Sequence, residues 1–270
     1  MKILSSLFAG LVALTLLTPA KLFAADAEWN LTPPSGGTKI LIVTGDDYPG
    51  HKWRETAPVI KRLLEQDARL KVGIVEDPAA LASPRLWAWD VVLLHFQNWE
   101  KPGPGNVART NLQQFVAAGG GLVSVHFACG AWHGEWPEFQ NLIGRVWHGS
   151  GPGKAQHDPY GKFIVEIADK DHPVTRGMGD FETTDELYTC LTGDAPIHLL
   201  AHSKSKVDQK YHAQAFVRDY GTGRVFLTTL GHDVKAWTNS PSVGELLRRG
   251  CAWTAAKGGT SRPPAPASRD

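Results

Sequence analysis

The chain has 270 residues, a formal net charge of +1 and a hydrophobic content of 42%. A chain of this length can bury the core of one α/β domain of roughly 200–250 residues. The nearly balanced charge excludes an electrostatic basis for binding nucleic acid or an anionic membrane surface.

The first 25 residues have the pattern of a secretory signal peptide. Lys2 precedes an apolar run, Leu7–Leu17, which is too short to span a bilayer, and small residues suited to cleavage follow in Phe23-Ala-Ala-Asp26. We expect residues 1–25 to be removed and the mature protein to be exported, periplasmic or secreted, with no membrane segment after cleavage. A retained amphipathic anchor is the alternative. Residues 26–37, rich in proline and glycine, are expected to be a linker.

From residue 38 onward, short apolar strands alternate with amphipathic helices, which is typical of a mostly parallel sheet with helices on both faces. After the buried strand 122–125 the pattern loosens into a loop-rich insertion. A hairpin turn is expected at 219–223, and a disordered tail at 258–270. The expected strands are 39–44, 70–76, 90–95, 122–125, 162–167, 197–202, 214–218 and 224–230, and the expected helices are 54–67, 107–118, 139–144 and 243–253.

Histidines recur at the carboxyl ends of the predicted strands. Because these ends lie along one edge of a parallel sheet, residues distant in sequence converge there. A single histidine in this position is usually structural, but four predict a shared pocket, with acidic residues reaching it from loops. The histidines are His51, His95, His126 and His232, and the acids are Asp46, Asp47, Asp185 and Glu186.

Imidazole and carboxylate groups together support either proton transfer or a divalent metal such as zinc. The sequence has no HExxH or other local zinc motif, so a metal site must be assembled by the fold. Cys129 is a candidate nucleophile, but His126 occupies the sharp turn directly after the strand, so we expect Cys129 to be a buried apolar residue.

The cysteines Cys129, Cys190 and Cys251 are far apart in the sequence and form no CxxC motif. A domain of this size needs no disulfide framework. The sequence leaves open either one disulfide with a free thiol or three free thiols.

Several motifs resemble those of the trehalose-utilisation (ThuA-like) family, over about residues 38–257. They are Gly-x-x-x-x-x-His-x-Trp at 45–53, Gly-Gly-Gly-Leu-Val-Ser-Val-His at 119–126, Leu-Ile-Gly-Arg-Val-Trp-His at 142–148, His-Pro-Val-Thr at 172–175, Asp-Glu-Leu-Tyr at 185–188, Gly-Arg-Val-Phe-Leu-Thr-Thr-Leu-Gly-His at 223–232 and Gly-Cys-Ala-Trp at 250–253.

The resemblance implies a flavodoxin-like, doubly wound fold similar to that of class I glutamine amidotransferases. His126 stands where those enzymes carry their cysteine, so glutamine hydrolysis through a thiolate is not expected. The resemblance also implies disaccharide breakdown, acting near 3-keto sugars made by a partner sugar dehydrogenase. The predicted signal peptide does not fit a purely cytoplasmic role in sugar utilisation. The resemblance therefore does not establish trehalose itself as the substrate.

These observations lead to three hypotheses. The first is an exported enzyme that acts on a sugar or glycoside, such as a 3-keto-disaccharide, by hydrolysis, elimination or isomerisation. The second is a non-catalytic sugar-binding module, and the third is a metal-dependent hydrolase of another substrate. The candidate catalytic residues are His126, His51, His232 and Glu186; the candidate substrate-binding residues are Trp53, Asp47, His148, Trp147, Asp185 and Tyr188; and the candidate metal ligands are His51, His126, His148, His232 and Glu186.

Overall fold

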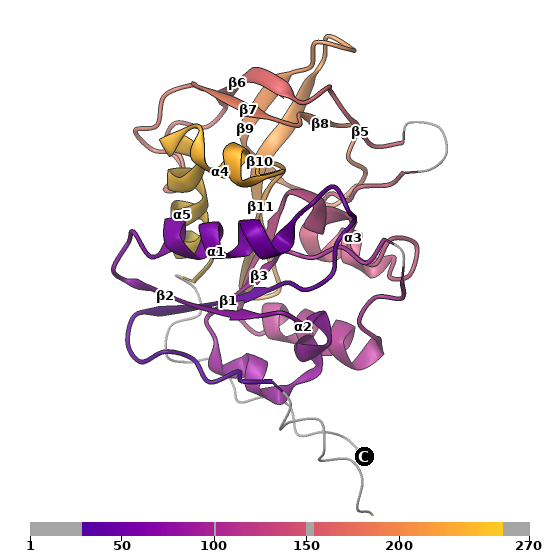
Figure 1. Cartoon of the computed structure of the whole chain (residues 1–270), viewed down its shortest axis with the longest axis vertical. Coiled ribbons are helices and arrows are strands. Elements are labelled where there is room, and N and C mark those ends of the chain that lie inside the picture. The colour runs from indigo at the N-terminus through magenta and orange to yellow at the C-terminus, as the bar shows by residue number, and fades with distance from the viewer. Residues whose placement is uncertain (1–28, 100, 150–153, 256–270) are drawn as a thin grey trace, which may run out of the picture.

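The computed structural model describes residues 29–99, 101–149 and 154–255. Within these ranges the chain forms one nine-stranded sheet flanked by helices, with a two-stranded sheet beside it (Figure 1). The predicted signal peptide (1–25) and tail (258–270) lie outside the described residues. Residues 29–37, the described part of the predicted linker, contain no helix or strand, and Leu31 among them is buried in the core.

One half of the large sheet is parallel, as the strand–helix alternation predicts. Its order in the described chain is β2-β1-β3-β4-β11, which is the flavodoxin-like order 2-1-3-4 followed by a fifth parallel strand. We call these strands the parallel half. They are β2 (Leu70–Val75), β1 (Thr38–Val43), β3 (Val91–Leu94), β4 (Gly121–Val125) and β11 (Gly223–Thr228).

The other half of the sheet is antiparallel, so the prediction of a mostly parallel sheet is wrong. Here β10, β9, β6 and β7 extend the sheet beyond β11, each antiparallel to its neighbour. The physical reason lies in the connections: the turn between β10 and β11 is far too short for the crossover that parallel strands need. The strands of this antiparallel half are β10 (Tyr211–Tyr220), β9 (His198–Lys204), β6 (Gly161–Ile167) and β7 (Phe181–Asp185).

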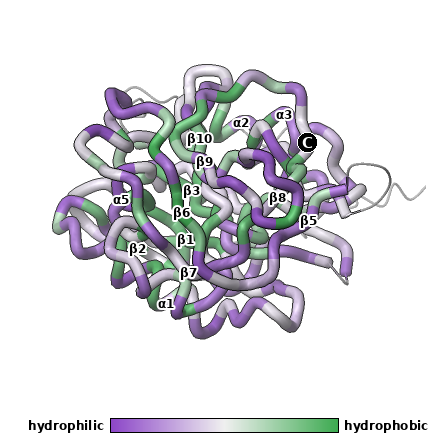
Figure 2. Tube along the Cα trace, turned by 90° about the horizontal axis from the view of Figure 1, so that it is seen from above, coloured by the Kyte–Doolittle hydropathy of each residue, from purple (hydrophilic) through white to green (hydrophobic). Residues whose placement is uncertain are grey.

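Helices cover both faces of the parallel half, which confirms the doubly wound arrangement. On β1, Leu41 and Val43 pack against one layer, whereas Ile40 and Ile42 pack against the other. The first layer contains α2 (Asn106–Ala117), α3 (Glu138–Ile143) and the short 3-10 helices η2 (Pro78–Ala82) and η3 (Pro84–Ala88); the second contains α1 (Trp53–Leu64), α4 (Val234–Thr238) and α5 (Pro241–Ala255). Figure 2 shows the hydrophobic positions gathered along the central strands and the hydrophilic ones in the surrounding loops.

The predicted loop-rich insertion follows β4. It contains the 3-10 helix η4 (His126–Gly130), α3 and β5 (Gln156–His157), which pairs with β8 (Tyr188–Thr189). This small sheet brings the segment after β7 beside the carboxyl end of the parallel half.

Among the described residues, no helix has both the length and the apolar character needed to cross a membrane. All three cysteines lie in the described ranges as free thiols.

Candidate active site

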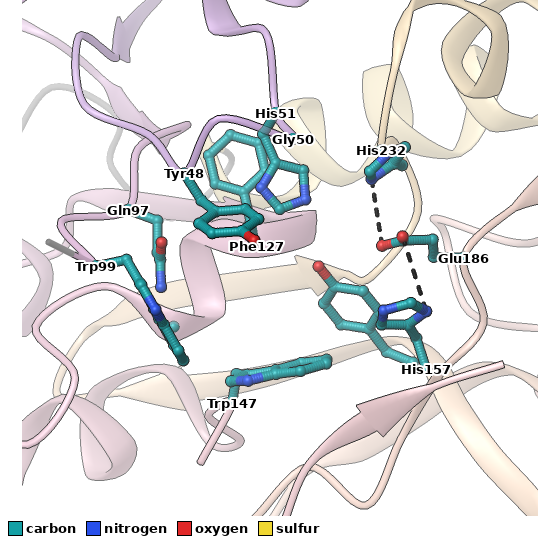
Figure 3. Close-up of a pocket in the computed structure, with 12 residues that line it drawn as sticks. Tyr48, Gly50, His51, Gln97, Trp99, Phe127, Trp147, His157, Glu186 and His232 are labelled. Atoms are coloured by element: carbon teal, nitrogen blue, oxygen red, sulfur yellow. Dashed lines mark ion pairs between the residues drawn. The ribbon is translucent and has the colours of Figure 1, made fainter. Parts of the chain in front are cut away.

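A pocket of about 340 Å³ opens at the carboxyl edge of the parallel half (Figure 3). One end is lined by imidazole and carboxylate groups, and the remaining wall is largely aromatic. The lining residues are Tyr48, Gly50, His51, Gln97, Trp99, Phe127, Gly130, Trp147, His157, Glu186, Tyr188 and His232. They come from the segments that follow β1, β3, β4, β7 and β11, from the segment after α3 and from the short strands β5 and β8, so both halves of the sheet contribute to the pocket.

His126 is the first residue after β4 and lies fully buried behind the pocket wall. Its backbone has φ +46°, in the left-handed region, as expected for the strained strand-to-helix turn predicted there. Its Nδ1 lies 2.6 Å from the carbonyl oxygen of Thr229, which can only accept, so Nδ1 carries the proton. Nε2 therefore offers its lone pair, and the Tyr188 hydroxyl donates to it at 2.9 Å.

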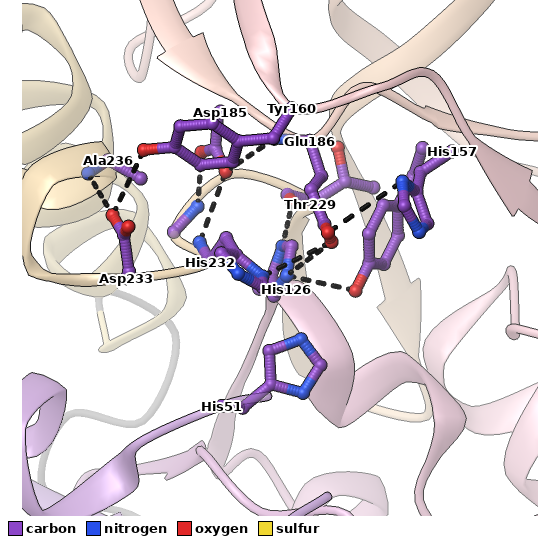
Figure 4. Close-up of polar contacts among 12 residues, drawn as sticks. His51, His126, His157, Tyr160, Asp185, Glu186, Thr229, His232, Asp233 and Ala236 are labelled. Atoms are coloured by element: carbon purple, nitrogen blue, oxygen red, sulfur yellow. Dashed lines mark hydrogen bonds and ion pairs between the residues drawn. The ribbon is translucent and has the colours of Figure 1, made fainter. Parts of the chain in front are cut away.

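Glu186 lies at the centre of the polar end of the pocket (Figure 4). Its Oε2 is 3.2 Å from Nδ1 of His232 and 3.6 Å from Nε2 of His126, while its Oε1 is 3.7 Å from Nδ1 of His157. Burial alone would raise the pKa of Glu186, but the contacts with the imidazoles of His126 and His232 outweigh burial and hold that pKa well below its usual range. The site therefore keeps one carboxylate ionised among imidazoles.

The pKa of His232 shifts in the complementary direction. Burial lowers this pKa, but the carboxylate of Glu186, 3.2 Å from Nδ1, and further carboxylates nearby outweigh burial and raise it above the ordinary value. Glu186 and His232 therefore favour each other's charged forms and can act as an anion–cation pair at the pocket wall.

Asp185 fixes the position of this pair without lining the pocket. Its Oδ2 accepts a hydrogen bond from the backbone N–H of Gly231 at 2.6 Å, and its Oδ1 accepts those of His232 and Glu186 at 3.1 and 2.8 Å. The carboxylate is fully buried. It connects the loop after β11 to the end of β7. Asp185 is therefore a positioning residue, whereas the sequence had predicted that it binds substrate.

His51 completes the cluster from the loop after β1. Its ring centroid lies 5.1 Å from that of His126 and 4.9 Å from that of His232. Its Nδ1 lies 3.1 Å from Oδ1 of Asp47. Burial lowers the pKa of His51 to about 2 and raises that of Asp47 to about 9, so the low dielectric favours the uncharged form of both groups. Asp47 thus supports His51 and does not line the pocket with it.

His51, His126, His232 and Glu186 form one of two groups among the described residues that could hold a metal ion; the other, Cys190, Asp208 and His212, lies outside the pocket lining. One ligand atom from each residue lies within 4.8 Å of all the others. The structure therefore brings together four of the five ligands predicted from sequence. His148, the fifth, is exposed, with its ring centroid 5.4 Å from that of His133, and it lies outside this cluster. It follows an irregular segment whose course the strand pattern does not define.

Two further residues selected from the sequence lie away from this pocket. His95 ends β3 but is fully buried, with Nδ1 and Nε2 each 3.1 Å from the hydroxyl of Thr44 and Thr56, and burial lowers its pKa to about 3. It is a structural histidine, satisfied as a neutral ring. Trp53 opens α1 and is buried under the guanidinium of Arg54, 4.1 Å above its ring, so it does not line the pocket.

Two of the predicted aromatic residues lie at the pocket. Trp147 and Tyr188 both line the pocket, and their ring centroids are 4.6 Å apart.

Cys129 is fully buried, and burial raises the pKa of its thiol to about 12, so it is not an activated nucleophile.

Other pocket residues were not selected from the sequence. Gln97 and Trp99 directly follow β3, so the strand-end rule that selected His95 could have selected them too. His157 lies on the short strand β5, where no periodic pattern marks it. Only the pairing of β5 with β8 places it opposite Glu186.

The fold and the site together define a class. The protein has a flavodoxin-like parallel half consistent with the class I glutamine amidotransferase-like fold, with an imidazole at the turn after the central β4 strand and no activated thiol. Residues 39–254 match the model of the ThuA family, described as trehalose utilisation. The chain belongs to this family.

Solved structures agree with this assignment. A ThuA-like protein from Parabacteroides merdae is 25% identical, with a TM-score of 0.70 over 83% of this chain and 91% of that one. A ThuA-like protein from Bacteroides uniformis is 17% identical, with a TM-score of 0.65 over 84% and 95%. A β-galactosidase from Bacillus circulans shares the fold alone, at 13% identity and a TM-score of 0.51, over 82% of this chain and 31% of that enzyme. No curated protein sequence matches the chain significantly.

Proposed function

We propose that this protein is an enzyme that breaks down a 3-keto glycoside by proton transfer next to the keto group. The family supports a role related to trehalose utilisation. The observation that carries the proposal is the ionised Glu186 held among imidazoles at one end of an aromatic-walled pocket. These groups suit a reaction in which negative charge develops on a carbonyl oxygen while a carbon loses a proton.

The substrate class follows from the shape and lining of the pocket. A volume of about 340 Å³ lies in the range of small-molecule sites and suits a sugar ring. Trp147 and the half-exposed Trp99 and Tyr48 supply flat apolar surfaces for the C–H faces of such a ring. Gln97, buried at the wall, supplies a polar amide that can bind a hydroxyl.

A keto group at C3 acidifies the proton on C2, and this determines the chemistry. In the proposed step, His157 takes the C2 proton, the C–H electrons form a C1=C2 double bond, and the C1–O bond breaks. His157 then gives the proton to the departing oxygen, and water adds across the double bond to complete a net hydrolysis. His157 suits this role because its Nδ1 donates to the carbonyl of Asp158 at 2.9 Å, which leaves Nε2 basic.

The developing charge on the C3 oxygen needs a partner at the other end of the pocket. The charged form of His232, favoured by Glu186, can donate a hydrogen bond to that oxygen. Residues His126 and Asp185, buried behind the pocket wall, and Tyr188, which forms part of that wall, hold this pair in place. The assignment moves His126 from the expected base to a positioning role.

The test uses a methyl 3-keto-glucoside in deuterated water, followed by NMR. We expect deuterium at C2 and release of methanol, both lowered at least about 100-fold in His157→Gln and Glu186→Gln. His148→Gln, an exposed histidine outside the cluster, is the matched control and should keep full activity. Binding without exchange or methanol release would reject the enzyme and indicate a sugar-binding module.

The cellular setting is part of the same proposal. The N-terminal sequence pattern supports export to the periplasm or medium, and a sugar dehydrogenase is the class of enzyme that would supply a 3-keto substrate. Mass spectrometry of the mature N-terminus of the expressed protein tests export: cleavage near residue 25 is expected, and an intact N-terminus would contradict it.

A further inference from the structure

We propose that His51, His126, His232 and Glu186 bind one divalent transition-metal ion, with zinc as the preferred ion. This inference deepens the proposed function because it rests on the same pocket. The four side chains come from four separate loops, yet one donor atom from each lies within 4.8 Å of the others. In a tetrahedral zinc site with bonds of about 2.0–2.1 Å the donors lie roughly 3.4 Å apart, so side-chain shifts of about 1 Å close the set.

Two histidines of the set are held from behind, as metal ligands are. Nδ1 of His126 donates to the carbonyl of Thr229, so the lone pair on Nε2, which accepts from the Tyr188 hydroxyl at 2.9 Å in the metal-free protein, is the one that would bind the ion. Nδ1 of His51 lies 3.1 Å from the carboxyl group of Asp47, so Nε2 is the ring nitrogen turned away from that partner. A carbonyl or carboxyl group bonded to the second ring nitrogen is the usual outer-shell support of a metal-binding histidine.

The third histidine lacks a partner that a metal would supply. Nδ1 of His232 is buried and has no hydrogen bond, although Oε2 of Glu186 lies 3.2 Å away. An unsatisfied buried nitrogen is costly. The backbone N–H of His232 is fixed by Asp185, so the ring is directed at the cluster by a rigid loop. An ion shared by His232 and Glu186 satisfies both groups at once.

The donor types select the ion. Three imidazoles and one carboxylate suit zinc and its neighbours in the first transition series, whereas calcium and magnesium prefer oxygen donors alone. The buried Cys129 supplies no thiolate to the set, which consists of nitrogen and oxygen donors only. One carboxylate against a doubly charged ion leaves net positive charge at the pocket wall.

That charge lies where the proposed reaction needs it. The ion would take over from His232 the stabilisation of the C3 oxygen, since a Lewis acid polarises a carbonyl strongly. Oε2 of Glu186 faces the histidines of the set, whereas its Oε1 faces His157. His157 is outside the ligand set, so its ring is not taken up by the ion.

The test measures zinc binding directly, with tag-free protein first stripped by a chelator. Calorimetry with zinc chloride is expected to give one site per chain, and cobalt(II) substitution should give the visible absorption of a low-symmetry nitrogen–oxygen site. Glu186→Gln and His232→Gln, which change partly exposed side chains, should each weaken binding at least about tenfold. His148→Gln should leave both readouts unchanged.

The outcomes separate the two proposals. Absence of a saturable zinc site in the folded wild-type protein, or equal affinity in Glu186→Gln and His148→Gln, would overturn the metal site. Sugar turnover that survives complete removal of metal would overturn its role in the reaction and leave the proposed function standing. One bound zinc ion without any turnover of 3-keto glycosides would reject the proposed function and leave the metal site standing.

Discussion

At the scale of single residues, the site depends on buried hydrogen bonds that hold imidazoles in one tautomer. His126 makes one hydrogen bond with each ring nitrogen: Nδ1 donates to the carbonyl of Thr229, and Nε2 accepts from the hydroxyl of Tyr188. Both His126 and Tyr188 are buried, so water cannot replace either partner. The geometry of the pocket wall is therefore sensitive to the loss of a single oxygen atom.

Removing that oxygen gives the first stability prediction. In the metal-free protein, Tyr188→Phe leaves Nε2 of His126 buried without its donor, which should lower the free energy of unfolding by about 1–3 kcal/mol. Urea denaturation measures this change. Tyr211→Phe is the control, because Tyr211 is exposed and its 3.3 Å bond to Glu166 lies at the surface. Equal effects of the two substitutions would contradict the prediction.

The carboxylate of Asp185 gives a second prediction at the same scale. Asp185→Asn places an amide N–H₂ against one of three backbone N–H donors, so the loop that carries His232 loses a partner. We expect a loss of about 1.5–3 kcal/mol in the free energy of unfolding, together with weaker zinc binding. Asp180→Asn is the comparison, because Asp180 is exposed and its carboxylate accepts a single backbone N–H, that of Ile167. A stable Asp185→Asn variant with unchanged zinc affinity would show that this carboxylate does not position His232.

The strand-end rule explains what the sequence could predict of the site. His51, His126 and His232 were found because parallel strands bring their carboxyl ends together. The same rule selected His95 wrongly, since position along a strand does not tell whether a side chain meets Thr44 and Thr56 or an open pocket. His157 could not be found, because only long-range pairing of two very short strands places it.

At the scale of elements, the loop after β11 carries His232 and depends on Gly231. This glycine has φ +117°, which side chains of L-residues rarely adopt, and an added Cβ would overlap the buried indole of Trp237 in α4. The same glycine donates its N–H to Asp185. Backbone conformation, packing and hydrogen bonding therefore all fix this loop at one residue.

Gly231→Ala should accordingly displace His232. We expect the free energy of unfolding to fall by more than about 2 kcal/mol and the zinc affinity to fall with it. Gly179→Ala is the matched control, since Gly179 is exposed and a Cβ there meets no atom within 4 Å. Crystals or NMR spectra of a stable Gly231→Ala protein with an unmoved His232 ring would refute this reasoning.

The elements of the two halves differ in how far the sequence predicted them. In the parallel half, strand–helix alternation and the buried run of β4 determine the order and the layers. In the antiparallel half, β6, β9 and β10 were located, but β7 was not, and the strand directions were not predicted. The hairpin turn before Gly223 already required antiparallel neighbours. The order β10-β9-β6-β7 depends on side-chain packing between distant segments and has no local signal.

At the scale of the whole molecule, buried neutral histidines make stability depend on pH. The pKa of His95 is about 3 in the folded protein, against an ordinary value of 6.5. Above pH 6.5 neither state takes up the proton. As the pH falls from 6.5 toward 3, only the unfolded state does, so stability is lost at up to about 1.4 kcal/mol per pH unit.

Substitution of His95 should reduce that dependence. Between pH 7 and pH 5, His95→Gln should lose about 2 kcal/mol less of its free energy of unfolding than the wild type, since glutamine can bond both threonines without titrating. Urea denaturation at the two pH values measures the difference. His148→Gln, at an exposed histidine, should keep the wild-type dependence. Parallel pH dependence in His95→Gln and the wild type would show that His95 titrates normally.

The pocket spans the junction between the two halves of the sheet, and this has a consequence for the dynamics of the protein. Its polar end takes His51, His126 and His232 from the parallel half, whereas Glu186 and Tyr188 follow the antiparallel strand β7. A ligand or ion that contacts residues from both halves acts as a non-covalent cross-link between the two halves. Local opening of β6 and β7 then requires release of the occupant, so their amide hydrogen exchange should slow on binding together with that of β4 and β11.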